Sequence, residues 1–133
     1  MNPKLRDKLV KMAELLKDLP KGKNRHLSFL VKKKTILAIG ANNYYKTHPL
    51  AKHYNYRYNV IHSEFAALCG FKNVKDLPDK CFMVNIRINK FEELKMAKPC
   101  KKCQRLLRNF GIQTVYYSTS NGEFESMTVK DYG

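Results

Sequence analysis

Residues 62–64 read His-Ser-Glu, and residues 99–103 read Pro-Cys-Lys-Lys-Cys. The imidazole of His62 and the thiolates of Cys100 and Cys103 can fill three positions of a tetrahedral zinc site, which leaves the fourth position for water. Glu64 is not needed as a ligand, so its carboxylate is free to move protons. An open zinc site beside a carboxylate is suited to hydrolysis.

A zinc ion that only stabilises the fold is the alternative interpretation of these segments. Such a site is normally closed by a fourth Cys or His. Four further residues could close it, although no spacing pairs them with the two segments: Cys69, Cys81, His48 and His53. Cys69 follows an apolar helical stretch and Cys81 opens an apolar strand, so we expect both to be small buried hydrophobic residues. The open site is therefore favoured.

The composition indicates a globular domain with a strongly basic surface. The chain has 133 residues, of which 44% are hydrophobic, and its 26 Lys+Arg against 11 Asp+Glu give a formal charge of +15. This excess favours an anionic partner, such as a nucleic acid or a nucleotide. No apolar run approaches the roughly 18 residues that span a bilayer, and the N-terminal segment does not resemble a signal peptide. We therefore expect a cytoplasmic, intracellular protein with no membrane partner.

The spacing of apolar residues predicts an α/β fold with the element order α-β-β-α-β-α-β-β. Helices are expected over residues 4–19, 61–71 and 99–110, and strands over residues 26–33, 35–41, 81–89, 112–118 and 123–129. Asn121-Gly122 is a strong hairpin signal, so the last two strands should be antiparallel. Helices that alternate with strands cover a sheet on both faces. We expect a three-layer α-β-α fold with a central five-stranded mixed sheet, in a single domain over residues 1–133.

The two segments resemble the zinc-dependent cytidine/deoxycytidylate deaminase superfamily, whose signature is His-x-Glu followed by Pro-Cys-x-x-Cys. The resemblance covers a deaminase core over residues 23–129, preceded by an N-terminal helix and linker over residues 1–22. It implies that His62, Cys100 and Cys103 bind Zn²⁺. It also implies that Glu64 is catalytic and carries protons while water replaces the amine of a nucleobase. With its predicted final hairpin, the chain resembles the branch of the superfamily whose last two strands are antiparallel. This branch includes free-nucleoside deaminases and bacterial toxin deaminases.

Residues around the two segments are the expected substrate contacts. Gly40-Ala41-Asn42 is similar to the family's Gly-x-Asn, whose asparagine contacts the sugar, and Ser63 stands where the family usually has alanine. Residues 42–59 contain five tyrosines among basic residues, a mixture typical of grooves that bind single-stranded nucleic acid. The expected substrate-binding set is Asn42, Lys46, His48, Tyr58, Ser63 and Pro99.

The substrate stays open at this point. The charge and the tyrosine-rich segment favour cytosine in a single-stranded nucleic acid, with free cytidine or deoxycytidylate as the alternative. Adenine is a third candidate, because the same zinc chemistry serves it. A non-catalytic, zinc-containing nucleic-acid-binding module is the alternative of a different class, and Glu64 argues against it because a structural site has no need of that carboxylate. The resemblance is also compatible with a homo-oligomer.

Overall fold

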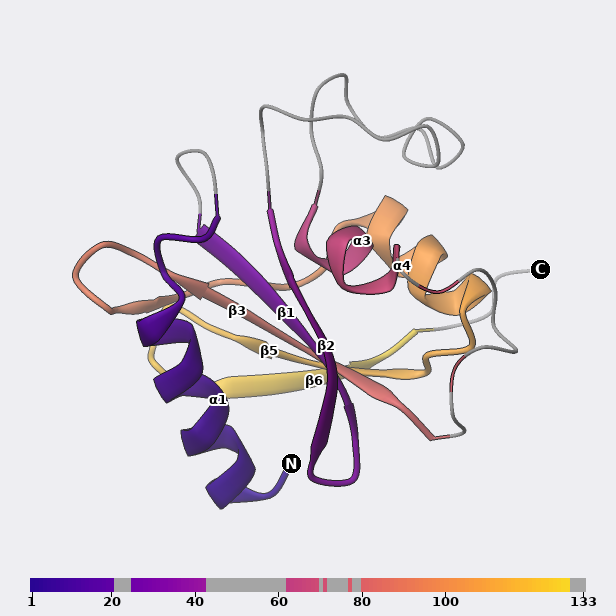
Figure 1. Ribbon diagram of the computed structural model, residues 1–133, viewed down its shortest axis with the longest axis horizontal. Coiled ribbons are helices and arrows are strands. Elements are labelled where there is room, and N and C mark those ends of the chain that lie inside the picture. The colour runs from indigo at the N-terminus through magenta and orange to yellow at the C-terminus, as the bar shows by residue number, and fades with distance from the viewer. Residues whose placement is uncertain (21–24, 43–61, 70, 72–76, 78–79, 130–133) are drawn as a thin grey trace.

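The described residues form one mixed sheet with helices on both faces (Figure 1). The computed structural model describes residues 1–20, 25–42, 62–69, 71, 77 and 80–129. The helices are α1 (Pro3–Leu15), α3 (Ser63–Leu68) and α4 (Lys101–Asn109). The strands are β1 (Arg25–Lys32), β2 (Thr35–Ala41), β3 (Phe82–Ile88), β4 (Leu94–Lys95), β5 (Thr114–Ser118) and β6 (Phe124–Thr128).

The strand order is β2-β1-β3-β5-β6, and only the β3–β5 pair on this path is parallel. β5 and β6 pair antiparallel across the turn that contains Gly122, whose φ of 79° is accessible to glycine without strain. The hairpin predicted from Asn121-Gly122 is thus confirmed. A sixth strand, β4, was not predicted: its two residues pair with the end of β3 and are too few to leave a periodic pattern.

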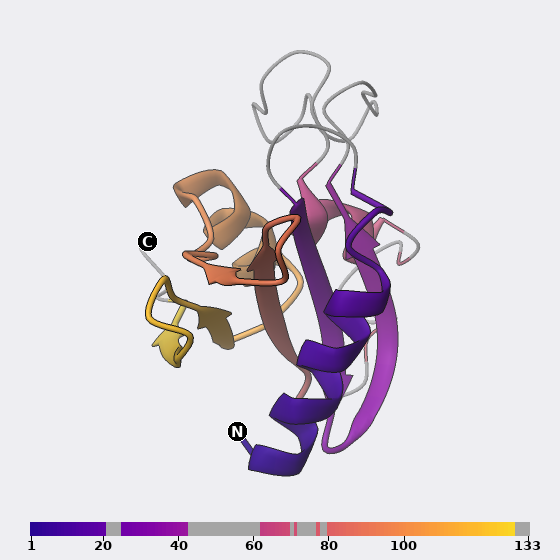
Figure 2. The same cartoon turned by 90° about the vertical axis from the view of Figure 1, so that its left-hand side faces the viewer.

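Two apolar clusters separate the sheet from its helices and define the three layers. The first lies between the sheet and the pair α3 and α4, and includes Leu30, Met83 and Val115 from the strands. The second lies between the opposite face of the sheet and α1, and includes Leu9 of the helix and Phe29 of β1. Figure 2, turned by 90°, shows α1 in front of the sheet and α4 on its other side. The three-layer prediction is confirmed.

The first helix ends earlier than its apolar pattern predicts. Asn2 caps its start, because the Oδ1 atom accepts hydrogen bonds from Lys4 N at 2.8 Å and Leu5 N at 3.4 Å. The helix stops at Leu15, and Leu16 after it still packs against the apolar cluster. Two other leucines of the predicted pattern face solvent, since Leu15 is 85% exposed and Leu19 is 54% exposed, so a longer helix would bury little further apolar surface. Among the described helices, none combines the length and the apolar character that a membrane span needs.

Cys69 corrects one prediction, since its side chain is exposed. α3 ends at Leu68, and Cys69 caps it with the Sγ atom donating to Ala66 O at 3.3 Å. The short helix therefore turns this residue away from the apolar cluster. Cys81, by contrast, is partly buried and packs against the cluster below α3 and α4.

Candidate active site

The side chains of His62, Cys100 and Cys103 come together at the starts of α3 and α4. His62 Nδ1 lies 3.8 Å from Cys100 Sγ and 3.5 Å from Cys103 Sγ, and the three ligand atoms lie within 4.8 Å of one another. A tetrahedral zinc with Zn–S of about 2.3 Å and Zn–N of about 2.0–2.1 Å requires a sulfur–nitrogen separation of about 3.6 Å. The donor set and its spacing therefore fit zinc and leave one position open.

Local structure explains why these three side chains converge. His62 and Cys100 are the N-cap residues of α3 and α4, so both leave extended backbone just before a helix begins. Cys103 lies in the first turn of α4, and its backbone N–H donates to Cys100 Sγ at 3.5 Å. Residues three apart on a helix face the same side, which brings the two sulfurs toward one point.

Close packing of α3 on the sheet brings His62 to the cysteines. Gly40 of β2 lies directly beneath the helix: a Cβ atom at this position would overlap Ala67 N and Ser63 O and lie 2.8 Å from Ala66 C. Only glycine allows the helix backbone to approach the strand this closely.

A closed ring of hydrogen bonds surrounds the carboxyl group of Glu64, which is buried with 5% exposure. Ser63 Oγ lies 3.2 Å from Glu64 Oε1, and Asn85 Nδ2 donates to Glu64 Oε2 at 3.0 Å. Ser28 Oγ closes the ring, since it lies 2.7 Å from Ser63 Oγ and donates to Asn85 Oδ1 at 2.7 Å. We call these four residues the Glu64 ring.

The Glu64 ring is fully hydrogen-bonded when Glu64 carries a proton. Three of its contacts each need a hydroxyl proton: Ser63–Glu64, Ser63–Ser28 and Ser28–Asn85. The two serines carry one hydroxyl proton each, so one of the three contacts lacks a donor. A protonated carboxyl supplies the third by donating to Ser63 Oγ. Burial also raises the pKa of Glu64 above its ordinary value, because desolvation penalises the carboxylate. The surroundings therefore favour a carboxyl group that holds a proton readily.

A small pocket of about 130 Å³ opens beside the zinc ligands and Glu64. Two of the expected substrate contacts, Asn42 and Ser63, line it. Asn42 is buried, and its Oδ1 accepts a hydrogen bond from the backbone N–H of His26 at 2.7 Å. The described residues lining the pocket are His26, Asn42, His62, Ser63, Glu64, Ala97, Lys98 and Cys100.

The other expected substrate contacts are not among the described residues that line this pocket. Lys46, His48 and Tyr58 lie outside the described residues. Pro99 is buried next to Cys100, and its carbonyl oxygen accepts a hydrogen bond from Gln104 Nε2 at 2.9 Å. Pro99 is not among the described residues that line the pocket. Its hydrogen bond with Gln104 stabilises the start of α4.

Comparison with known proteins identifies the family. The family model for the cytidine and deoxycytidylate deaminase zinc-binding region matches residues 3–119. The chain belongs to the cytidine and deoxycytidylate deaminase family. Enzymes of this family are zinc-dependent hydrolases that deaminate nucleobases, so zinc is the cofactor implied for the His62, Cys100 and Cys103 cluster of this deaminase.

Solved structures show the same fold at low sequence identity. The dCMP deaminase of cyanophage S-TIM5, in its apo form, is 22% identical with a TM-score of 0.59, covering 88% of this chain and 84% of that chain. The same enzyme in complex with dCMP and dUMP gives the same identity and TM-score. The cytidine deaminase of Burkholderia pseudomallei is 12% identical with a TM-score of 0.61, covering 97% of this chain and 94% of that chain. A search of curated protein sequences gives no match.

The electrostatics of the deaminase site favour a metal-binding thiolate. A hydrogen bond from Cys103 lowers the pKa of Cys100 to about 4, against the opposing effect of burial, and His62 contributes in the same direction. The ordinary value is 9.0, so the thiolate is present at neutral pH and is lost only as the pH falls through about 4.

We therefore expect zinc to be retained at neutral pH and to be released only after the pH has fallen through about 4, because protons compete with the metal for Cys100 only below its pKa. Zinc content after dialysis across a pH series measures this. Cys100→Ser should lose zinc at pH 7, whereas Cys69→Ser, at an exposed cysteine outside the cluster, should retain it. Full zinc retention by Cys100→Ser would contradict the assigned ligand set.

Four residues that lie at the site were not predicted from the sequence: Ser28, Asn85, His26 and Lys98. Ser28 and Asn85 are buried polar residues that interrupt the apolar central stretches of β1 and β3, and this interruption was a usable signal. His26 and Lys98 gave no such signal, because basic residues are common throughout this chain. Burial, with the nearby charge of Arg87, lowers the pKa of His26 to about 4, so this pocket residue is neutral at physiological pH.

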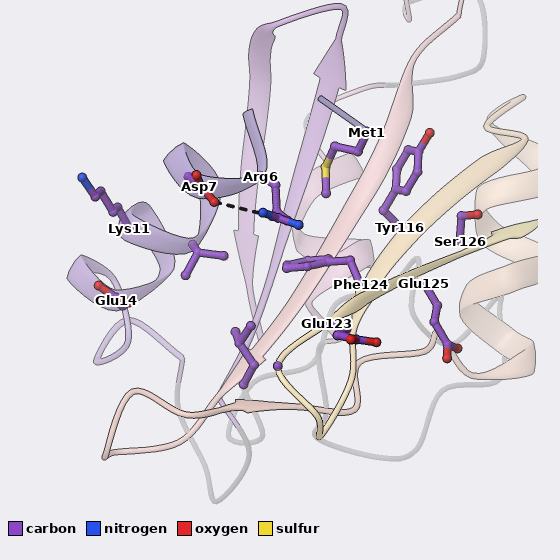
Figure 3. Close-up of a pocket in the computed structure, with 13 residues that line it drawn as sticks. Met1, Arg6, Asp7, Lys11, Glu14, Tyr116, Glu123, Phe124, Glu125 and Ser126 are labelled. Carbon is purple, nitrogen blue, oxygen red and sulfur yellow. Dashed lines mark ion pairs between the residues drawn. The ribbon is translucent and has the colours of Figure 1, made fainter. Parts of the chain in front are cut away.

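A wider hollow of about 900 Å³ lies away from the zinc ligands of this deaminase, between α1 and the β5–β6 hairpin. Figure 3 shows Phe124 and Tyr116 beside it, with Arg6 and Asp7 paired at 3.5 Å on the helix. None of its described lining residues belongs to the zinc cluster or to the Glu64 ring. The chemistry therefore belongs to the smaller pocket.

Proposed function

We propose that this chain catalyses the hydrolytic deamination of cytosine to uracil, with His62, Cys100 and Cys103 as the zinc ligands and Glu64 as the proton carrier. The observation that carries the proposal is the three-ligand cluster beside a buried carboxyl group in one pocket. A purely structural zinc would need neither the open position nor the carboxyl group.

The proposed roles follow from the chemistry of each group. Zinc held by the three ligands would supply an acidified water as the nucleophile, since the metal lowers the pKa of that water. Glu64 takes a proton and returns protons to the ring nitrogen and the leaving amine of the base. The reaction consumes one water and releases one ammonia, and a carbonyl replaces the amine. The Glu64 ring supports the first half of this transfer, because it accommodates the protonated carboxyl.

The pocket supports a single base as the reacting group. It is small, and Glu64 lies deep within it, so a base must leave any stack to reach the carboxyl group. Asn42 and His26 line the same space, and we propose that they face the base and its sugar.

Within this proposal we favour cytosine in a single-stranded nucleic acid as the substrate. The formal charge of the chain is +15, and several basic side chains lie near the pocket. Lys98 lines the pocket and is exposed, and Lys101 and Arg105 are exposed on α4, the helix that carries two zinc ligands. A phosphate backbone can bind such a surface with little dependence on sequence.

A free nucleotide is the second candidate, and the comparisons favour it. The cyanophage S-TIM5 enzyme, whose fold this chain shares, was crystallised with dCMP and dUMP. Lys98 alone could pair with one phosphate, so the pocket does not require a polymer.

The experiment is deamination of cytidine, dCMP, single-stranded DNA, duplex DNA, RNA and adenosine by the purified protein, followed by mass spectrometry. We expect conversion of cytosine in single strands. With about three phosphate contacts, the apparent affinity for single-stranded DNA should fall roughly 20-fold between 50 and 200 mM salt. Turnover of neutral cytidine should barely change over this range.

A matched pair of variants sharpens the substrate test. Lys101→Ala should weaken binding of the single strand and lower the salt dependence, whereas Lys34→Ala, in the exposed turn at the other end of the β1–β2 hairpin, should do neither. Conversion of dCMP alone would overturn the nucleic-acid substrate in favour of the free nucleotide. Conversion of adenosine alone would overturn cytosine as the base.

A further inference from the structure

On the face of β1 and β3 that lies below α3, Leu30 pairs with the apolar Met83, and His26 pairs with Arg87. Between these two pairs the face carries Ser28 and Asn85. The register of the two strands places these residues directly opposite each other. Both are buried, with exposures of 0% and 2%. Polar groups in such a position stabilise a fold no better than apolar residues of similar shape, because their hydrogen bonds mainly offset the cost of desolvation. The hydrogen bonds of Ser28 and Asn85 therefore indicate a role other than stabilising the fold.

The amide of Asn85 is held at both ends. Its Oδ1 atom accepts the hydroxyl proton of Ser28 at 2.7 Å, and its Nδ2 atom donates to Glu64 Oε2 at 3.0 Å and to Ala97 O at 3.4 Å. The hydrogen bond from Ser28 determines which way the amide faces, so that the NH₂ group is directed toward Glu64. The strand pair thus presents one fixed donor to the carboxyl group.

We infer that Asn85, oriented by Ser28, is a positioning residue that holds the Glu64 carboxyl group in line with the zinc ligands. This inference rests on the proposed function of Glu64. The helix that carries Glu64 has only six residues, and the glutamate side chain has several rotatable bonds. Asn85 reaches the carboxyl group from β3, a strand that is hydrogen-bonded to β1 on one side and to β5 on the other. A displacement of the proton carrier by about 1 Å lowers turnover by roughly 100-fold.

Asn85→Asp tests this inference, because it preserves the shape of the side chain and replaces the NH₂ donor with an oxygen. We expect kcat to fall by about 100-fold, while KM changes less than about threefold and the zinc content stays at one ion per chain. A residue that served only the fold would instead lower the amount of folded, zinc-loaded protein and leave the kcat of that fraction unchanged.

Asn89→Asp is the matched control. Asn89 Nδ2 also donates to a glutamate carboxylate, Glu93 Oε1 at 2.9 Å, but in the turn after β3, away from the pocket. The same substitution there should leave kcat unchanged. Ser28→Ala is the second variant, since it keeps Asn85 and removes only the hydroxyl that orients the amide. We expect it to fold and to lower kcat by about 10-fold with KM unchanged.

Full kcat in either folded variant, Asn85→Asp or Ser28→Ala, would overturn the positioning role. Glu64→Gln separates this outcome from failure of the proposed function. An inactive Glu64→Gln protein beside a fully active Asn85→Asp protein would overturn the positioning role alone. An active Glu64→Gln protein would overturn the proposed function itself.

Discussion

Glu64→Gln is expected to lower kcat by about 10³-fold or more while the protein keeps its zinc. The glutamine side chain has the shape of glutamate but cannot take up a proton and return it. Glu64 is not one of the three ligand residues, so the metal should stay bound. Deaminase assays and zinc content measure the two halves of this prediction.

The same substitution should leave the melting temperature unchanged or raise it. The Glu64 ring needs a third proton donor, which an ionised glutamate does not provide. The amide of glutamine can donate to Ser63 Oγ through its nitrogen and accept from Asn85 Nδ2 through its oxygen, so every contact of the ring is satisfied. It also removes the cost of burying a charge. Thermal unfolding of the zinc-loaded protein tests this.

Glu123→Gln is the matched control for Glu64→Gln. Glu123 is exposed in the turn between β5 and β6, so both activity and melting temperature should match those of the parent protein. Activity of Glu64→Gln within 10-fold of the parent would refute Glu64 as the proton carrier. A large drop in its melting temperature would contradict the conclusion that the Glu64 ring needs a proton donor at residue 64.

Gly40→Ala is expected to lower the free energy of unfolding by about 3 kcal/mol. The added Cβ would overlap backbone atoms of Ser63 and Ala67, and a helix backbone cannot move aside as a flexible side chain can. Either α3 shifts away from β2 or the protein fails to fold. Since His62 and Glu64 sit at the start of α3, the surviving protein should also bind zinc more weakly and turn over more slowly.

Gly122→Ala provides the contrast, because a Cβ there meets no atom within 4 Å. Its φ of 79° makes alanine unfavourable by about 1 kcal/mol, and the turn lies away from the zinc ligands. Chemical denaturation and zinc content should therefore separate the two variants. Equal stability losses, or normal zinc binding by Gly40→Ala, would contradict the close approach of α3 to β2.

Much of the fold was predictable because its elements are defined by local patterns. The strand Thr35–Ala41 has the predicted bounds, and β1 and β3 differ from theirs by one residue at each end. The errors have local causes as well. β4 is too short to have a period, and Leu15 and Leu19, which extend the apolar pattern of α1, are exposed.

The zinc ligand set was also predictable, because the residue types and spacing already limit what these side chains can bind. Cys100 and Cys103 lie one helical turn apart, so their sulfurs converge whatever surrounds them. His62 with Glu64 two residues later supplies the remaining ligand and a carboxyl group. These residues do not identify the substrate. Their proposed roles concern the base, and not the sugar and phosphate groups that distinguish a free nucleotide from a nucleic acid.

The sequence by itself determined the metal, the class of reaction and the order of the elements, because residue types and their spacing within short segments indicate each of them. Only the tertiary structure decided how Glu64 is held. Ser28, Asn85 and Glu64 come from two strands and a helix, and they meet through the β1–β3 register and the packing of α3 over Gly40. Such a meeting depends on strand pairing and close packing across the whole sheet, which no local pattern of residues specifies.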